Sequence, residues 1–202
     1  PAILNVWFGG SETGDAVADV LFGKVSPSGK LTTTFPRSVG QMPLYYSQMA
    51  TGRPDGDPNT FNRYASNYID CPNDGLYPFG FGLSYTTFEY GEMKLSSETM
   101  PKGGTIKVTV PVKNTGNCDA AETVQLYIRD KYADIARPVK ELKGFSRIFL
   151  KKGESRDVTF TISSDELKYY NADLVYKYDA GEFEVMVGPN SRDVQVQTFV
   201  AE

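Results

Sequence analysis

The chain has 202 residues, of which 40% are hydrophobic and 23% are charged, and its formal net charge is −4. This composition is that of a globular protein, and the absence of a basic block argues against nucleic-acid binding. No apolar run approaches the length that spans a bilayer. Histidine is absent, which excludes Ser-His-Asp and Cys-His pairings and histidine metal sites within the chain. Since no Gly-Lys-Ser/Thr phosphate loop or Cys-x-x-Cys pair occurs either, we expect neither a metal nor a cofactor.

The start of the chain and its two cysteines bear on cellular context. Pro1 opens directly on an apolar run, without a signal peptide, so we expect the natural N-terminus to lie upstream. Cys71 and Cys118 both fall in loop-like sequence. They allow one disulfide, but two cysteines make no disulfide framework, and two free thiols are the simpler expectation.

The first part of the chain has the pattern of one βαβ unit. Residues 2–8 form a nearly continuous apolar run, which predicts a strand buried on both faces. Residues 15–22 have amphipathic spacing and predict a short helix that ends at Gly23, and residues 31–35 predict a returning strand. One such unit cannot close a core, so we expect residues 1–90 to be the C-terminal end of a larger α/β sandwich domain. Its orphan sheet edges would favour docking or oligomerisation.

A long segment, residues 36–76, has little periodicity and is rich in proline. A loop of this length either serves function or packs on a neighbour. Asp55-Gly56-Asp57 lacks the rest of a calcium-binding loop, so a turn is expected there. The aromatic residues of the segment favour packing or ligand contact, and they include Tyr45, Tyr46, Phe61, Tyr64 and Tyr68.

From about residue 88 the pattern changes to period two, and apolar residues alternate with polar ones in about seven runs separated by turn signals. This pattern predicts an antiparallel β-sandwich over residues 91–202. Pro111 is awkward inside a strand, so we expect it at an edge, at an outward non-bonded position or at a bulge. The predicted strands are residues 88–95, 105–112, 124–129, 142–150, 157–162, 183–187 and 194–196.

Between the two parts, residues 77–88 read Tyr-Pro-Phe-Gly-Phe-Gly-Leu-Ser-Tyr-Thr-Thr-Phe. Gly80 and Gly82 permit backbone angles and close approaches that a Cβ would forbid. The aromatic side chains need a place to bury, so this linker is expected to be an ordered seam between two packed bodies. The seam residues are Tyr77, Phe79, Phe81, Tyr85 and Phe88.

This linker resembles the signature that ends the second domain of glycoside hydrolase family 3, the family of β-glucosidases and β-xylosidases, where it leads into a fibronectin type III-like (immunoglobulin-like) domain. The similarity runs almost the full length of the chain. Residues 7–36, with Gly-Gly-Ser-Glu-Thr-Gly-Asp-Ala at 9–16, resemble the family's last βαβ segment, and residues 63–80 resemble the run into its signature. The segments that resemble its terminal sandwich are Arg137-Pro138 and residues 140–145, 150–154, 181–183 and 187–188.

The resemblance implies an exo-acting β-glycosidase that hydrolyses terminal β-linked sugars with retention of anomeric configuration. Retaining glycosidases use two carboxylates about 5 Å apart. In the family, the nucleophilic aspartate lies on an N-terminal barrel and the acid/base glutamate lies upstream of the last βαβ segment, and no position of this chain matches either motif. The resemblance therefore implies a segment that is not catalytic alone. Its partners would be the upstream catalytic domains of the same polypeptide and a carbohydrate, in a periplasmic or secreted protein.

Several residues outside the seam are candidates for function. Glu12 follows the first predicted strand, where α/β proteins place functional groups, but a loop residue that hydrogen-bonds backbone amides is the favoured interpretation. Trp7 has a ring that can stack on a sugar, but its apolar run favours core packing. Arg63, Tyr64 and Tyr68 either line the outer rim of a sugar pocket or pack between domains.

Two other functions stay open, and the sequence does not determine which sugar is cleaved. A docking subunit of a split enzyme would use the orphan sheet edges. A stand-alone carbohydrate-binding or adhesion module would present aromatic residues on one sandwich face, although an orphan βαβ unit argues against it. The candidates for such a face are Tyr127, Tyr169, Tyr170, Tyr176 and Tyr178.

Overall fold

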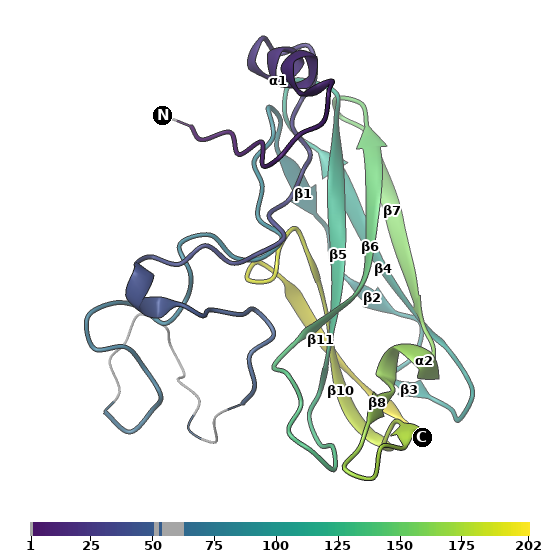
Figure 1. Cartoon of the computed structure of the whole chain (residues 1–202). Helices are drawn as coiled ribbons and strands as arrows, with labels where there is room; N and C mark the ends of the chain where they lie inside the picture. Colours follow the sequence, from purple (N-terminus) through teal and green to yellow (C-terminus); the bar gives the residue numbers. More distant parts are fainter. Residues whose placement is uncertain (1, 51–52, 54–62) are drawn as a thin grey trace.

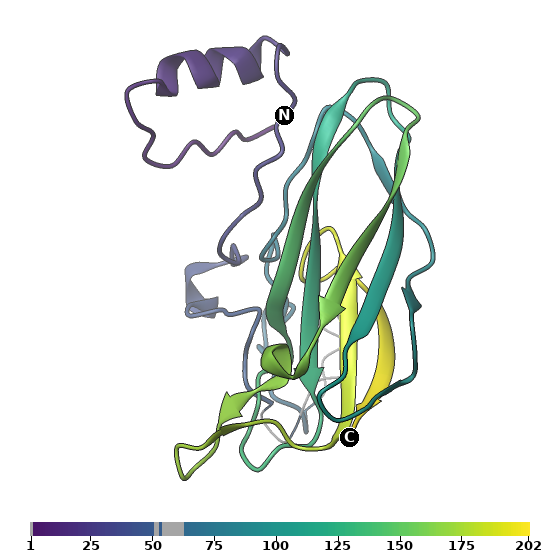
Figure 2. The ribbon, with the colours of Figure 1, turned by 90° about the vertical axis from the view of Figure 1, so that its right-hand side faces the viewer.

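The computed structural model describes residues 2–50, 53 and 63–202. A β-sandwich occupies one side of the molecule, and beside it lies an N-terminal part made of loops and a short helix (Figures 1 and 2). The predicted β-sandwich is therefore confirmed. Within the described ranges, no helix has both the length and the apolar character needed to cross a membrane.

The sandwich consists of a four-stranded and a five-stranded sheet. In the first, β4 (Ile106–Asn114) pairs with β7 (Ser155–Ile162) on one side and with the short strands β1 (Phe88–Tyr90) and β2 (Lys94–Leu95) on the other. The second has the order β3-β11-β10-β5-β6, in which β3 and β11 are parallel and the other neighbours antiparallel. Its strands are β3 (Thr99–Met100), β5 (Ala120–Asp130), β6 (Glu141–Leu150), β10 (Gly181–Gly188) and β11 (Gln195–Ala201).

Smaller elements decorate this framework. Helix α2 (Ser164–Leu167) follows β7 and begins with a capping box, in which the side chains of Ser163 and Glu166 satisfy backbone N–H groups. A two-stranded hairpin of β8 (Tyr169–Tyr170) and β9 (Tyr176–Lys177) comes next. The described residues of the N-terminal part include helix α1 (Thr13–Leu21) and the 3₁₀ turn η1 (Val39–Gln41).

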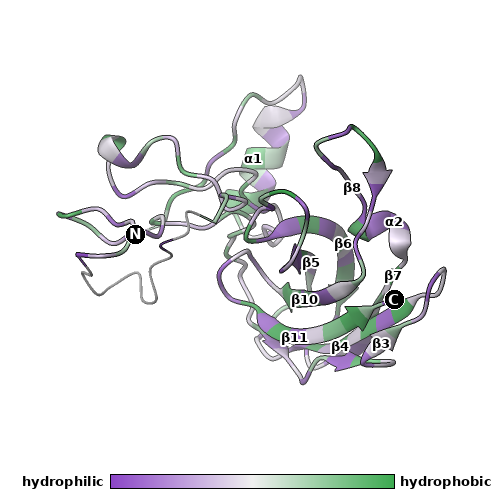
Figure 3. Cartoon of the chain, turned by 90° about the horizontal axis from the view of Figure 1, so that it is seen from below, coloured by the Kyte–Doolittle hydropathy of each residue, from purple (hydrophilic) through white to green (hydrophobic). Residues whose placement is uncertain are grey.

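The core lies between the two sheets, because apolar side chains alternate with polar ones along the strands, as predicted. Along β4, one side chain in two is completely buried while its neighbours face outward. Phe183 of β10 and Phe199 of β11 stack with ring centroids 5.6 Å apart. Figure 3 shows the alternation of hydrophobic and hydrophilic residues along the strands. The completely buried residues of β4 are Ile106, Val108, Val110, Val112 and Asn114.

Pro111 lies where the ladder beside β4 is interrupted. The register pairs Tyr90 of β1 with Val112 and Lys94 of β2 with Thr109, so the residues opposite Pro111 belong to neither short strand. The Pro111 carbonyl still accepts a hydrogen bond from Gly91 N at 2.8 Å. The missing N–H of proline therefore faces an irregular stretch, one of the places expected for it.

The N-terminal part differs from the sequence prediction in its strands. Helix α1 forms and Gly23 follows it with a φ of 74°, as its expected role as a stop requires. The two predicted strands flanking the helix, residues 2–8 and 31–35, do not form in this chain, apart from a bridge between Phe35 and Tyr77. A buried parallel strand needs hydrogen-bonding neighbours on its edges. In the described part, residues 2–8 make no backbone bond to another strand, and residues 31–35 are bonded to residues 77–81 only at Leu31 and Phe35.

Two further predictions concern loops. Cys71 and Cys118 are free thiols, so the simpler of the two expectations is confirmed. The turn predicted at Asp55-Gly56-Asp57, and Phe61 beside it, lie outside the described residues.

Candidate functional site at the interface with the sandwich

The linker 77–88 lies between the N-terminal part and the sandwich, and its aromatic rings contact both. Phe79 stacks on Tyr46 with centroids 4.2 Å apart, and Tyr46 meets the ring of Tyr127 of β5 edge-on at 5.8 Å. Tyr77 stacks on Phe81 at 5.0 Å and meets Phe35 edge-on at 6.4 Å. The rings form two groups, one around Phe79 that reaches the sandwich and one around Tyr77, which together make the aromatic layer of this interface.

The two remaining aromatic residues of the linker contact opposite partners. The Tyr85 hydroxyl donates to the carbonyl of Val20 in α1 over 2.7 Å. Phe88 begins β1 and packs against the sandwich core. The C-terminal end of the linker therefore also connects helix α1 to the sandwich.

The backbone around Gly80 is hydrogen-bonded on two sides. Gly80 N donates to Leu31 O over 2.7 Å, which holds the linker to the N-terminal part. On the sandwich side, Gln125 of β5 donates its Nε2 to Gly80 O at 3.1 Å and to Pro189 O at 2.7 Å. The Tyr127 hydroxyl donates to Gln125 Oε1, and burial raises the pKa of Tyr127, which keeps it a donor. The amide of Gln125 is thus satisfied while 3% exposed.

A buried ion pair also crosses the interface. Lys30 Nζ lies 3.1 Å from both carboxylate oxygens of Glu122 on β5. The Lys30 side chain is 13% exposed and the Glu122 side chain 4% exposed. The Tyr90 hydroxyl donates to Glu122 Oε1 at 2.8 Å, and burial together with the neighbouring carboxylate raises the pKa of Tyr90. Both charges are therefore paired and hydrogen-bonded, as buried charges must be.

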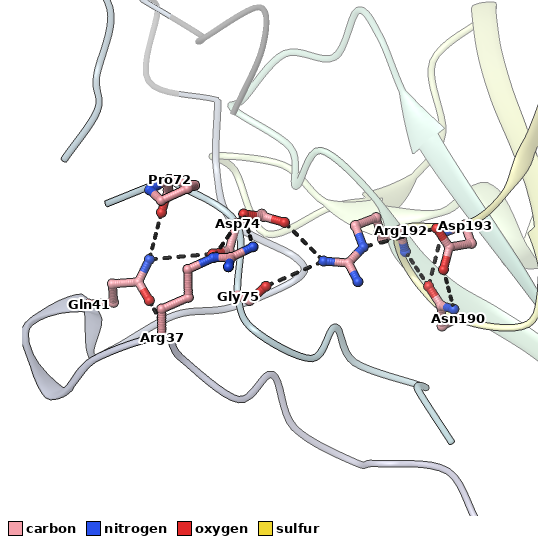
Figure 4. A network of polar contacts seen from close by, with 8 residues as sticks. All are labelled: Arg37, Gln41, Pro72, Asp74, Gly75, Asn190, Arg192 and Asp193. Atoms are coloured by element: carbon pink, nitrogen blue, oxygen red, sulfur yellow. Dashed lines mark hydrogen bonds and ion pairs between the residues drawn. The ribbon is translucent and has the colours of Figure 1, made fainter. Parts of the chain in front are cut away.

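A second polar network joins the segment before the linker to the β10–β11 loop (Figure 4). Arg192 of that loop donates from Nη1 to Asp74 Oδ2 over 2.9 Å and to Gly75 O over 3.3 Å. Asp74 Oδ1 accepts from Arg37 Nη2 at 3.0 Å and from its Nε at 3.3 Å. The Asp74 carboxylate thus lies between one guanidinium group from the sandwich and one from the N-terminal part.

Gln41, at the end of η1, extends this network on the N-terminal side. Its Nε2 donates to Pro72 O at 2.8 Å, and its Oε1 accepts the backbone N–H of Arg37 (Figure 4). Its side chain is enclosed, with 1% of the residue exposed. The Gln41 carbonyl accepts the Tyr68 hydroxyl at 3.0 Å, so Tyr68 belongs to the same network.

The other candidate residues do not gather in one site. Glu12 precedes α1, is exposed, and its side chain makes no capping hydrogen bond, although its carbonyl accepts Ala16 N at 3.1 Å. The backbone amide bonding expected of its side chain is therefore not formed. Arg63 lies over the ring of Tyr64, with its guanidinium carbon 5.5 Å from the centroid. Helix α1 and the η1 region lie at different ends of the N-terminal part, so Glu12 and Tyr68 share no site (Figure 1).

Trp7 does not pack in a core in this chain. It is 56% exposed and meets the Phe35 ring edge-on at 6.4 Å. The expectation of core packing was wrong for the chain as it stands, because the strand that would carry Trp7 inward does not form. Residues 4–10 and α1 instead enclose a shallow, mostly apolar hollow that Glu12 also lines.

The tyrosines proposed for a carbohydrate-binding face do not share one. Tyr127 and Tyr169 are buried, and Tyr178 packs against the core with its hydroxyl donating to Glu202 O. Tyr170 and Tyr176 are exposed as a cross-strand pair on the β8–β9 hairpin, with centroids 4.8 Å apart. Cross-strand aromatic pairs of this kind stabilise hairpins, which is the simplest account of them.

The charged residues of the interface were not predicted from the sequence. Glu122 had a detectable signal, since it occupies a position of β5 in phase with the buried Val124 and Leu126. Arg192 and Asp74 had none, because they are 118 residues apart and lie in loops. Among the described residues, no three His, Cys, Asp or Glu side chains gather as metal ligands would.

Comparisons with known proteins define the class. Residues 1–85 match the family model of the glycosyl hydrolase family 3 C-terminal domain, and residues 122–191 match a fibronectin type III-like domain. The chain belongs to glycoside hydrolase family 3 and carries these two parts of it, as its sequence motifs suggested.

Particular relatives cover nearly the whole chain. It is 49% identical over 198 residues to a periplasmic beta-glucosidase of Salmonella typhimurium and 46% identical over 198 residues to a beta-xylosidase of Formosa agariphila; each alignment covers 98% of this chain and 26% of the relative. A crystal structure of a beta-glucosidase from Listeria innocua in complex with gluconolactone superposes with a TM-score of 0.90 at 41% identity, over 96% of this chain and 27% of that one. The chain thus spans about a quarter of the length of these curated relatives.

Proposed function

We propose that this chain is the C-terminal part of a retaining, exo-acting β-glycosidase of the β-glucosidase type, which hydrolyses terminal β-linked sugars from oligosaccharides or glycosides. The observation that carries the proposal is the alignment of nearly the whole chain with a beta-glucosidase and a beta-xylosidase. A retaining mechanism needs two carboxylates about 5 Å apart, and the chain has no position that matches the family's catalytic motifs. Catalysis therefore belongs to upstream domains of the same polypeptide.

The role of this part is mechanical. Residues 1–90 complete the α/β sandwich domain, residues 91–202 form the fibronectin type III-like domain, and residues 77–88 join them. The aromatic layer, the Lys30–Glu122 pair and the Arg192–Asp74 network support this role, because together they fix the sandwich against the α/β part. An extensive interface of this kind restricts motion between domains.

The N-terminal part would dock on the upstream sheet. Ile3 and Phe8 are 87% and 103% exposed, and Phe22 after α1 is 88% exposed. Such exposure is expected of an apolar segment that forms a strand only when the neighbouring strands of its sheet are present. In a split enzyme, the same exposed apolar residues would bind the separately encoded catalytic chain.

The fluorescence of Trp7, the only tryptophan, reports this docking. In residues 1–202 alone, we expect emission typical of an exposed indole and efficient quenching by acrylamide, because Trp7 is 56% exposed. Adding the separately produced upstream portion should shift the emission to shorter wavelength and reduce quenching. The Trp7→Phe variant, mixed in the same way, provides the blank. Unchanged quenching at saturating upstream portion would contradict the docking.

Arg63, Tyr64 and Tyr68 are proposed to line the outer rim of the sugar pocket. Tyr68 belongs to the interface network and Arg63 and Tyr64 lie just before it in the chain, with the Arg63 guanidinium over the Tyr64 ring. Tyr64 is 71% exposed, which supports a place at a surface rim. A periplasmic or secreted location is proposed for the whole protein, and the similarity to a periplasmic beta-glucosidase supports it.

The first test is release of nitrophenol from a panel of aryl β-glycosides. We expect turnover by the whole polypeptide and none above buffer by residues 1–202 alone. Glu12→Gln in the whole polypeptide should leave kcat within about twofold, because Glu12 matches neither catalytic motif of the family and its side chain makes no capping hydrogen bond. Turnover by the isolated chain that disappears in Glu12→Gln would overturn this assignment and make Glu12 catalytic.

A further inference from the structure

Asp74 is the point at which the sandwich holds the segment before the linker. Its Oδ2 accepts from Arg192 Nη1 at 2.9 Å, and the same Arg192 nitrogen donates to the adjacent carbonyl of Gly75 at 3.3 Å (Figure 4). The Asp74 and Arg192 side chains are 23% and 40% exposed. One arginine thus fixes both a side chain and the backbone that follows it.

From Asp74 the contacts lead back to Tyr68. Gln41 Nε2 donates to Pro72 O at 2.8 Å and to Asp74 O at 3.4 Å, and the Gln41 carbonyl accepts the Tyr68 hydroxyl at 3.0 Å. Tyr68 N donates to Asn73 Oδ1 at 2.8 Å, one residue before Asp74. The position of Asp74 is therefore transmitted to Tyr68 through hydrogen bonds on both of its sides.

The β10–β11 loop that carries Arg192 is held firmly by the sandwich. Asn190 and Ser191 are 4% and 5% exposed. Asn190 Oδ1 accepts the backbone N–H groups of Arg192 and Asp193, each at 2.9 Å. Ser191 N donates to Phe79 O at 2.9 Å, and Lys140 Nζ donates to Ser191 O at 2.6 Å. Arg192 thus projects from an ordered base, which is what a positioning group needs.

We propose that Arg192 is a positioning residue: from the sandwich, through Asp74 and Gln41, it sets the place of the segment that carries Arg63, Tyr64 and Tyr68 at the rim of the sugar pocket. The proposal rests on the proposed function, since only a rim segment would translate its position into substrate affinity. The fibronectin type III-like domain then affects binding of a sugar without contacting it.

Kinetics distinguish positioning from plain stabilisation. A partly exposed ion pair contributes little to global stability, so losing Arg192 should leave the thermal midpoint almost unchanged. Misplacing rim residues that bind substrate and transition state equally raises KM and leaves kcat alone. Lysine at 192 keeps the charge toward Asp74 but lacks the planar guanidinium group whose Nη1 bonds both Asp74 and Gly75, so it should restore part of the affinity.

The experiment compares Arg192→Ala and Arg192→Lys with Arg156→Ala in the whole polypeptide. Arg156 of β7 pairs with Glu154 at 2.9 Å on the β6–β7 turn and serves as a matched exposed pair. With a β-linked disaccharide, we expect Arg192→Ala to raise KM roughly three- to tenfold with kcat within about twofold, and Arg192→Lys to recover part of the loss. Amide hydrogen exchange over residues 64–73 should become faster in Arg192→Ala and remain unchanged in Arg156→Ala.

These measurements test the positioning role of Arg192 and the proposed glycosidase function separately. Unchanged KM and unchanged exchange in Arg192→Ala would overturn the positioning role. A parallel loss of kcat and thermal midpoint, without rescue by lysine, would also overturn it in favour of a structural role. A wild-type polypeptide without glycosidase activity would refute the proposed function and the link to the pocket rim, while the exchange rates would still decide whether Arg192 orders this segment.

Discussion

Replacing Glu122 with alanine is expected to lower the free energy of unfolding by about 3–5 kcal/mol, because a buried cation would lose its partner. Lys30 is 13% exposed and lies 3.1 Å from both carboxylate oxygens. Without that carboxylate, the ammonium group would keep the Gly82 carbonyl of the linker, 3.5 Å away, as its hydrogen-bond acceptor. The Tyr90 hydroxyl would lose its acceptor in the same step. Urea denaturation of wild type and variant measures the difference.

Two further variants show whether the loss comes from the unpaired charge. Glu154→Ala removes a carboxylate whose side chain is 34% exposed, and it should cost no more than about 1 kcal/mol. The double variant Lys30→Met with Glu122→Gln removes both charges and keeps an acceptor for Tyr90, so it should recover most of the stability lost in Glu122→Ala. A loss below about 1 kcal/mol in Glu122→Ala, or no recovery in the double variant, would contradict a tightly coupled buried pair.

The sandwich was predictable because the alternation of apolar and polar residues in each strand indicates which side chains are buried. Successive side chains of a strand point to opposite faces, so the alternation in β4 puts Ile106 and Val110 on the same face. This assignment needs no knowledge of the rest of the chain. Residues 2–8 show the limit of the same reasoning. Their apolar run describes the surroundings that the strand is suited to, and strand formation also requires neighbours that this chain does not provide in its described part.

The interface was predictable in its aromatic layer and not in its charges. Aromatic side chains favour burial, so the linker was predicted to pack against other parts of the chain. The sequence did not identify Tyr46 and Tyr127 as the residues that it contacts. An ion pair requires two residues whose distance is set by the complete fold. Arg192 and Asp74 meet only because the β10–β11 loop and the segment before the linker approach from opposite sides, and no local pattern encodes that meeting.

Gly80→Ala is expected to lower the free energy of unfolding by about 3–4 kcal/mol, through a positive φ and a steric clash that act together. Gly80 has a φ of 80°, where a Cβ costs about 1 kcal/mol or more. That Cβ would also lie 2.0 Å from Gln125 Oε1. Gln125 is 3% exposed, and moving it would break its hydrogen bonds to Gly80 O and Pro189 O.

Gly103→Ala separates the two contributions. Gly103 has a φ of 72°, but a Cβ there has no neighbour within 4 Å, so this variant carries the backbone strain alone and should lose about 1 kcal/mol. Urea denaturation of both variants gives the clash as the difference between them. If the linker is the tightly packed seam that the Gly80 contacts indicate, Gly80→Ala must be the more damaging by about 2 kcal/mol. Equal losses would mean that Gln125 moves aside freely and that the linker is held by its aromatic layer and not by this backbone contact.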